Sequence, residues 1–377
     1  MLVACAPAAT PEATGDSTDA ANTTSTTGST STPASSSGID DSTSSEVTTQ
    51  GTSTDGSDED STSSTGADSS SSSTGGCIER LLPIDDVPAL LSQTGLYDDI
   101  VAGSIAADVQ EFTPRFPLWS DGADKQRWVW LPACEPIDTS DMDHWELPVG
   151  TRLWKQFTRD GVRIETRLIT RTGPGATQWR LATYVWNGDD AEHVTTGVED
   201  ALGTMHDVPD EVQCTACHRQ SWRVLGFSAI QLAHDGPGTT LQSLLDAGAL
   251  SDAPAVPVVV PGDDVAQSAL GMLHSNCGSC HSDDGVPFVD LELRLRTTDT
   301  VVEDTQAWQS AVGVPASMFE CDGCDLIEPG VPETSALVLR MLERGPDSEQ
   351  MPPLATELVD QTGVDALGAW ILSMPAG

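Results

Sequence analysis

The sequence contains the stretch Cys277-Gly278-Ser279-Cys280-His281 and, before it, Cys214-Thr215-Ala216-Cys217-His218. Both stretches read Cys-x-x-Cys-His, the pattern that attaches a c-type haem. In this pattern the two thiols bond to the vinyl groups of the porphyrin, and the histidine binds the iron as its proximal ligand. We therefore predict two covalently bound haem c groups, held by Cys214, Cys217, Cys277 and Cys280, with His218 and His281 as axial ligands.

Zinc is the alternative for the same thiols, because Cys-x-x-Cys pairs also build zinc sites. The pairs of a zinc ribbon usually lie ~15–20 residues apart, whereas 59 residues lie between Cys217 and Cys277. A histidine also follows each pair directly. The pattern therefore favours haem over zinc.

The charge of the chain limits its partners. Among 377 residues, 58 are acidic and 17 are basic, which gives a formal net charge of −41. Nucleic acid and anionic membrane surfaces would repel such a chain, so neither is expected as a partner. A basic redox partner is expected instead. No apolar run approaches the ~20 residues that a membrane-spanning helix needs.

The first residues, Met1-Leu2-Val3-Ala4-Cys5, resemble the cleavage site of a bacterial lipoprotein. We expect Cys5 to carry lipid, and Ala6 after it is typical of delivery to the outer membrane. The basic and apolar segments of a full signal peptide are missing, so we expect the true start to lie upstream. The expected location is the bacterial cell envelope, either in the periplasm or at the outer membrane through a lipid anchor.

The chain divides by composition into four segments. Residues 1–76 combine the lipoprotein-like start with a Ser/Thr/Gly/Asp-rich stretch, which cannot bury enough apolar surface to fold and is predicted to be a disordered tether. Residues 77–207 are predicted to form a β-rich domain that begins with short helices between Pro83 and Ile105. Residues 208–262 hold the first haem motif, and residues 263–377 are predicted to be mainly helical. The expected fold class is therefore α+β with several domains.

The β-rich domain is predicted from alternating apolar residues at Leu153–Phe157, Val162–Ile169 and Trp179–Trp186. Asp160-Gly161 between the first two is a strong signal for a two-residue hairpin. The strands are expected to form an antiparallel, sandwich-like domain. Seven tryptophans fall in this region, and we expect them to form its core, with a surface for binding a polymer as the alternative. They are Trp119, Trp128, Trp130, Trp145, Trp154, Trp179 and Trp186.

Residues 263–374 resemble a class I cytochrome c domain. A helix capped by Asp263 or Asp264 leads into the second motif, a further helix follows, Met351-Pro352-Pro353 comes next, and a last helix contains Trp370. Thr362 and Asp365 are expected to form a capping box at the start of this last helix. This resemblance implies that Met351 is the second axial ligand of the second haem, with Met341 as the alternative. The first motif has no such partner, and His206, Met205 and His234 are its candidates.

A wider resemblance, over about residues 80–374, is to bacterial di-haem c-type cytochromes with a β-rich N-terminal part. The segments that carry it are Pro117–Asp121, Lys125, Pro148–Thr151, Glu165–Leu168, Tyr184–Asn187, Val208-Pro209 and Leu225–Phe227. It implies two covalent haems and transfer of single electrons. The alternatives are a peroxidase-type enzyme that uses the first haem and a surface binding module with accessory haems.

Four further cysteines, Cys77, Cys134, Cys321 and Cys324, are an even number that suits two disulfides and an oxidising compartment. Cys321-Asp322-Gly323-Cys324 has no following histidine and departs from the haem pattern. A local disulfide is the favoured interpretation, and a redox-active dithiol is the alternative.

Overall fold

The computed structural model describes residues 86–375, except 219–222, 284, 286–289, 320, 322, 346–347 and 354–355. Cys5, the predicted tether and Cys77 therefore lie outside the described residues. The chain divides after Thr74, and Gly75–Gly377 form one compact unit. No helix among the described residues is long and apolar enough to cross a membrane.

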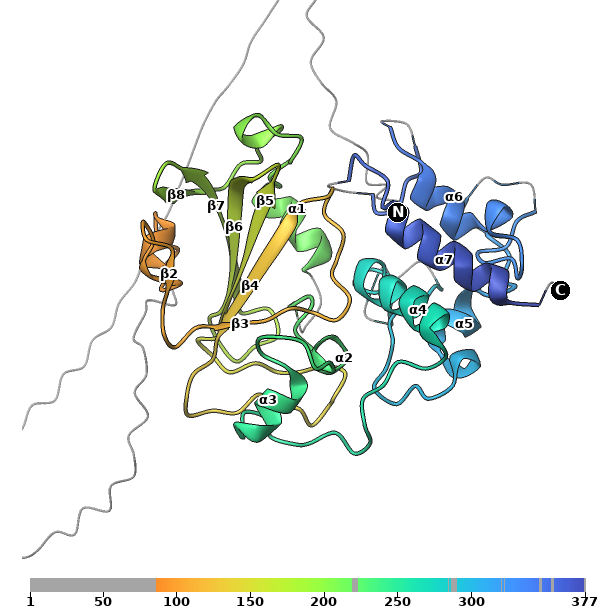
Figure 1. Cartoon of the computed structure of the whole chain (residues 1–377), viewed down its shortest axis with the longest axis horizontal. Coiled ribbons are helices and arrows are strands. Elements are labelled where there is room, and N and C mark those ends of the chain that lie inside the picture. Colours follow the sequence, from red (N-terminus) through yellow and green to blue (C-terminus); the bar gives the residue numbers. More distant parts are fainter. Residues whose placement is uncertain are drawn as a thin grey trace, which may run out of the picture. The chain divides into compact units, whose positions relative to one another are not determined.

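A six-stranded antiparallel sheet forms the first half of this unit, with each strand hydrogen-bonded to the next along the chain (Figure 1). The strands are β3 (Gln110–Glu111), β4 (Asp124–Trp130), β5 (Arg152–Arg159), β6 (Val162–Arg171), β7 (Trp179–Asn187) and β8 (Asp190–Val194). The three predicted strands are confirmed as parts of β5, β6 and β7. Asp160 and Gly161 form the β5–β6 turn with φ values of 52° and 79°, the left-handed geometry for which this dipeptide is favoured.

One face of the sheet is apolar and packs beneath a small hairpin. Alternation along the strands places Trp128, Trp154 and Leu168 on this face. They share a core with Tyr97 of the hairpin, which is made of β1 (Tyr97–Asp99) and β2 (Ser104–Ile105) and follows the 3₁₀ turn η1 (Leu91–Gln93). Six of the seven tryptophans are buried and Trp119 is half-buried, so the core interpretation is confirmed for six of them.

Two predictions for this region are corrected. Short helices are absent from the described part of residues 83–105 apart from η1, because Gly95 and Gly103 adopt φ values of 86° and 70° that interrupt a helix. The sandwich-like arrangement exists only in reduced form. Its second layer in the described residues is the two-stranded β1–β2 sheet, not a full second sheet.

The other face of the sheet is covered by the segment that contains the first motif. Helix α1 (Glu211–Cys217) is followed by α2 (Ala229–Leu232) and α3 (Leu241–Asp246). Val129 and Leu153 from this face share a core with Phe227 and Leu232. The side chain of Thr240 caps α3 by accepting a hydrogen bond from the Ser243 N–H at 3.1 Å.

Helices α4 (Asp264–Asn276), α5 (Gln306–Ala311), α6 (Ala336–Leu342) and α7 (Gln361–Ser373) form the second half of the unit, as Figure 1 shows. Three 3₁₀ turns complete the helical elements: η2 (Ala201–Gly203), η3 (Val302–Asp304) and η4 (Pro332–Thr334). The core includes Leu270 and Leu273 from α4 and Trp370 and Ile371 from α7. The antiparallel sheet together with these helices confirms the α+β class.

The caps of the two long helices explain where they begin. Asp263 caps α4 as predicted, and its carboxylate accepts from the Ala266 N–H at 3.0 Å. Helix α7 is capped by Asp360, which accepts from the Gly363 N–H at 3.0 Å, instead of by the predicted Thr362. Asp365, the expected partner of Thr362, accepts a hydrogen bond from the Gln361 side chain at 2.7 Å.

Hydrogen bonds tie the β-rich region to the C-terminal helices next to the second motif. The Trp119 N–H donates to the side-chain oxygen of Asn276 at 2.7 Å, one residue before Cys277. The Asp121 carboxylate accepts from the N–H groups of Glu357 at 2.8 Å and Leu358 at 3.1 Å. The loop before β4 therefore fixes both the end of α4 and the segment after Met351.

Candidate functional site

The first motif lies on α1, against the sheet. Asp210 caps this helix by accepting from the Gln213 N–H at 2.7 Å, and the Gln213 side chain accepts from the Asp210 N–H at 3.0 Å. The helix places Cys214 and Cys217, three residues apart, on the same side. The Cys214 thiol forms a hydrogen bond with Thr183 of β7, so the motif faces the polar face of the sheet.

His218 is held in a form that can bind a metal. Its Nδ1 lies 2.7 Å from the carbonyl oxygen of Arg223, and a carbonyl oxygen can only accept, so Nδ1 carries the proton. Arg223 in turn donates to the His218 carbonyl at 2.8 Å. Burial lowers the pKa of His218 to about 4, so the ring is neutral at pH 7. Nε2 then bears a free lone pair, which is the arrangement typical of a ligating histidine.

The second motif is formed by the turn that follows α4. Cys277 caps the helix, and its carbonyl accepts from the N–H groups of Cys280 at 3.0 Å and His281 at 2.9 Å. Nδ1 of His281 is buried and has no hydrogen-bond partner among the described residues. Burial, with a smaller contribution from the Arg340 charge, lowers the pKa of His281 to about 4. This imidazole is therefore also neutral at pH 7.

The two motifs meet at their second cysteines. The thiol of Cys217 forms a hydrogen bond with the thiol of Cys280, and this contact together with burial raises the pKa of Cys217. Burial also raises the pKa of Cys214 and brings that of Cys277 to about 12. These three cysteines are therefore neutral thiols at pH 7, and none of the four is disulfide-bonded.

The geometry gives the zinc alternative no support within the part of the chain that the structure describes. No group of three or more His, Cys, Asp or Glu side chains there is placed to hold a metal ion. The four thiols and two histidines are instead arranged as two separate Cys-x-x-Cys-His units that touch at one point. Each unit has the residue types that a covalently bound haem requires, so the residues present fit that group.

Met351 lies beside the same arginine as His281. Its N–H donates to the carbonyl oxygen of Arg340 at 2.9 Å, and the Arg340 charge acts on the His281 ring. Met351 is half-buried. Met341, the alternative ligand, packs against the core of the C-terminal helices.

Hydrogen bonds hold two of the three candidate ligands for the first haem, His206 and His234. His206 is buried, and its Nε2 donates to the Glu165 carboxylate at 2.7 Å. Met205 is 48% exposed. His234 is half-buried, donates from Nε2 to the Thr113 carbonyl at 2.7 Å and accepts at Nδ1 from the Gly236 N–H at 2.9 Å. No hydrogen bond joins any of these three side chains to the first motif within the described residues.

A group of charged side chains beneath the first motif was not predicted from the sequence. Arg127, Lys155 and Arg167 lie opposite one another on β4, β5 and β6. Arg167 donates from Nε at 2.9 Å and from Nη2 at 2.5 Å to the two carboxylate oxygens of Glu165. Burial alone would raise the pKa of Glu165, but the charge of Arg167 and the hydrogen bonds from His206 and Arg167 outweigh it and hold the pKa below 4.5. The positions of Arg127, Lys155 and Arg167 opposite one another can be found only when the register of the three strands is known.

A second missed residue is His274, which lies on α4 one turn before Cys277. Its Nδ1 accepts from the Leu295 N–H at 3.1 Å, and burial lowers its pKa to about 3. It lines a small cavity together with Phe227 and Gly278. Its spacing of three residues from Cys277 is the signal that could have placed it there.

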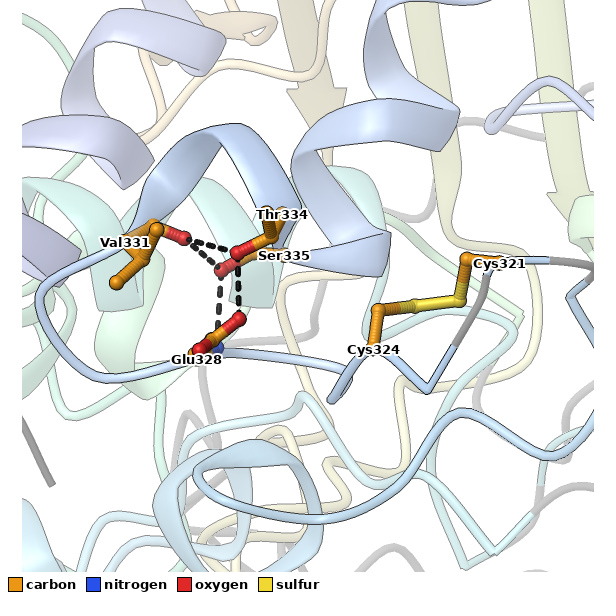
Figure 2. Close-up of a disulfide and its surroundings, with 6 residues drawn as sticks. All are labelled: Cys321, Cys324, Glu328, Val331, Thr334 and Ser335. Atoms are coloured by element: carbon orange, nitrogen blue, oxygen red, sulfur yellow. Dashed lines mark hydrogen bonds between the residues drawn. A yellow bond between two sulfur atoms is a disulfide. The ribbon is translucent and has the colours of Figure 1, made fainter.

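The remaining cysteines are oxidised where the structure describes them. Cys321 and Cys324 form a disulfide with a Cα–Cα distance of 5.7 Å, which is the local bridge that the sequence favours (Figure 2). In the adjacent loop the Ser335 hydroxyl accepts from the Glu328 N–H at 2.9 Å and donates to the Val331 carbonyl at 3.0 Å. Cys134 is also disulfide-bonded.

Comparisons with protein-family models, curated proteins and solved structures give no match for this chain.

Proposed function

We propose that the protein is a di-haem c-type cytochrome that carries single electrons in the cell envelope of a bacterium. Cys214, Cys217, Cys277 and Cys280 bind the two porphyrins, and His218, His281 and Met351 bind iron. The bound haems would supply the redox chemistry, and the chain would position them and set their potentials. In this proposal residues 263–377 form a class I cytochrome c-like domain.

The observation that carries the proposal is the state of His218. An imidazole that donates from Nδ1 to a backbone carbonyl presents Nε2 as a free acceptor. The ring is half-buried and neutral at pH 7, and it directly follows two thiols that are free and on one side of a helix. An iron ligand needs this tautomer, because the lone pair of Nε2 is then available to the metal.

The contact between Cys217 and Cys280 supports transfer between the two haems. Two porphyrins bonded to touching thiols would lie close together, so an electron could pass from one to the other within the chain. A net charge of −41 favours a basic donor or acceptor, and this docking would weaken as salt rises. A lipid at Cys5 and disulfides at the other cysteines fit a location outside the cytoplasm.

The experiment counts covalent porphyrins. The full chain, with a complete export signal, is expressed in a host that matures c-type cytochromes and is analysed by intact mass and by haem staining of a denaturing gel. We expect two porphyrins on the wild type. One should remain when Cys214 and Cys217 are both replaced by alanine, and one when Cys277 and Cys280 are replaced.

The matched control replaces Cys321 and Cys324 by serine, which also removes two cysteines and should leave both porphyrins. A wild-type mass without added porphyrin would refute the proposal. So would a visible spectrum that does not change when His281 is replaced by alanine.

One observation favours a second candidate, a peroxidase-type enzyme that uses the first haem. Hydrogen bonds to Glu165 and to the Thr113 carbonyl already hold the rings of His206 and His234, so a coordination position of the first haem would be open to a small molecule. A high-spin ferric spectrum from one haem would support the enzyme, and two low-spin haems would support the carrier.

A further inference from the structure

A row of cations crosses the sheet on the face that carries the first motif. Arg127 on β4 lies opposite Lys155 on β5, Lys155 lies opposite Arg167 on β6, and Arg167 lies opposite Thr183 on β7. Side chains that are directly opposite on adjacent antiparallel strands have Cβ atoms ~4.5–5.5 Å apart. Like charges at this spacing repel one another, so the row needs an anionic partner.

The described residues supply only part of the compensating charge. Glu165 pairs with Arg167 and also accepts the hydrogen bond of His206. Arg127 is 6% exposed, and its guanidinium forms no hydrogen bond or ion pair with any residue that the structure describes. Lys155 stacks on the Phe157 ring at 4.8 Å but has no carboxylate partner among those residues. Burial of an uncompensated charge is costly.

The row ends at the first motif. Thr183 forms a hydrogen bond with the Cys214 thiol. The charge of Arg167 acts on Cys214 and Cys217, and the charge of Lys155 acts on Cys217 and His218. Figure 1 shows α1, which carries these cysteines, beside the sheet. The uncompensated cations therefore face the place where the first porphyrin would be attached.

We infer that Arg127 and Lys155, supported by Arg167, bind the two carboxylates of the porphyrin that Cys214 and Cys217 hold. This inference rests on the proposed function. The porphyrin of a c-type haem carries two propionate side chains, so two carboxylates meet two cations that lack a partner. The planar guanidinium of Arg127 can bind a carboxylate with two parallel hydrogen bonds. The β-sheet is then one wall of the first haem site.

The electrostatic consequence can be measured. Ferric haem carries one more positive charge than ferrous haem, so nearby cations favour the reduced state. Loss of one cation therefore makes reduction less favourable. A unit charge that lies roughly 10 Å from the iron, in a medium with an effective dielectric constant of about 20, changes the equilibrium constant for reduction by about tenfold.

The test compares Arg127→Gln with Arg180→Gln in the mature full-length protein. Arg180 lies on β7, is exposed and is on the opposite face from Thr183. Its replacement therefore removes the same charge at a position away from the row. In a redox titration, R127Q should make reduction of one haem about tenfold less favourable, which is 59 mV for a one-electron couple. R180Q should change the equilibrium constant for reduction less than twofold. Arg127→Lys keeps the charge, so its equilibrium constant should lie much closer to that of the wild type than that of R127Q does.

Intact mass is measured on every variant, so that two kinds of failure are distinguished. Two porphyrins on both variants with equal potentials would overturn the inference and leave the proposed function standing. A wild type without porphyrin would remove the proposed function, and the inference with it. If R127Q does not mature, Lys155→Gln replaces it in the same comparison, and an unchanged potential in that variant also overturns the inference.

Discussion

Glu165 is the residue whose replacement tests the charged network most directly. Its carboxylate is fully buried and accepts two hydrogen bonds from Arg167 and one from His206. Replacement by glutamine keeps the shape and one acceptor oxygen but removes the negative charge. Arg167 then stays beneath the first motif without its counterion, beside Lys155.

The expected cost is about 3–5 kcal/mol of unfolding free energy, because removal of one partner leaves a buried charge uncompensated. This is a large part of the roughly 5–15 kcal/mol that stabilises a typical folded protein. The matched control is Glu146→Gln. Glu146 pairs with Arg171 at 3.5 Å, but its side chain is 70% exposed, so its loss should cost about 0–1 kcal/mol.

The measurement is urea denaturation followed by far-ultraviolet circular dichroism. The pKa of Glu165 in the folded protein lies below 4.5, so its charge contributes stability above that pH and loses it as the pH falls through the folded pKa. The deficit of E165Q against the wild type should therefore be full at pH 7 and shrink as the pH falls below 4.5 and through the lower pKa of the folded protein. A deficit at pH 7 no larger than that of E146Q would refute this account of the network.

Three further perturbations test other parts of the molecule. Met351→Leu should lower the reduction potential of one haem, because His/Met ligation raises it, and a redox titration should show no change for the exposed Met318→Leu. Asp263→Ala removes the cap of α4 and should cost about 1 kcal/mol in urea denaturation, whereas a loss below a few tenths would contradict the capping role. Replacing the Cys321–Cys324 disulfide by two serines should cost about 2 kcal/mol, the chain-entropy value for so short a loop, and an unchanged urea midpoint would count against it.

Local patterns in the sequence predicted local structure well. Strands β5 and β6 and their turn follow from alternation around Asp160-Gly161, and the start of α4 follows from Asp263. The predicted cap of α7 was wrong by two residues. Asp360 and Thr362 are both good capping residues, and only the fold selects between them. The predicted helix after Leu96 was also wrong. The apolar spacing of this segment fits a short helix, but Gly103 turns the chain into a hairpin.

The candidate site was only half predictable. The motifs themselves are contiguous in sequence, so their residues could be named directly. The row of Arg127, Lys155 and Arg167 depends on the register of three strands, which no local pattern reveals. The contact between Cys217 and Cys280 depends on packing between distant segments.

The link between the loop before β4 and the end of α4 has a consequence for how the chain can be divided. Asn276 takes its hydrogen bond from Trp119, and the backbone of Glu357 and Leu358 donates to Asp121. In a fragment that begins at residue 263, Asn276, Glu357 and Leu358 would lose these partners and could form the same hydrogen bonds only with water. The C-terminal helices therefore depend on the strands that precede them, and melting of the sheet should loosen both thiol-bearing turns in a single cooperative event.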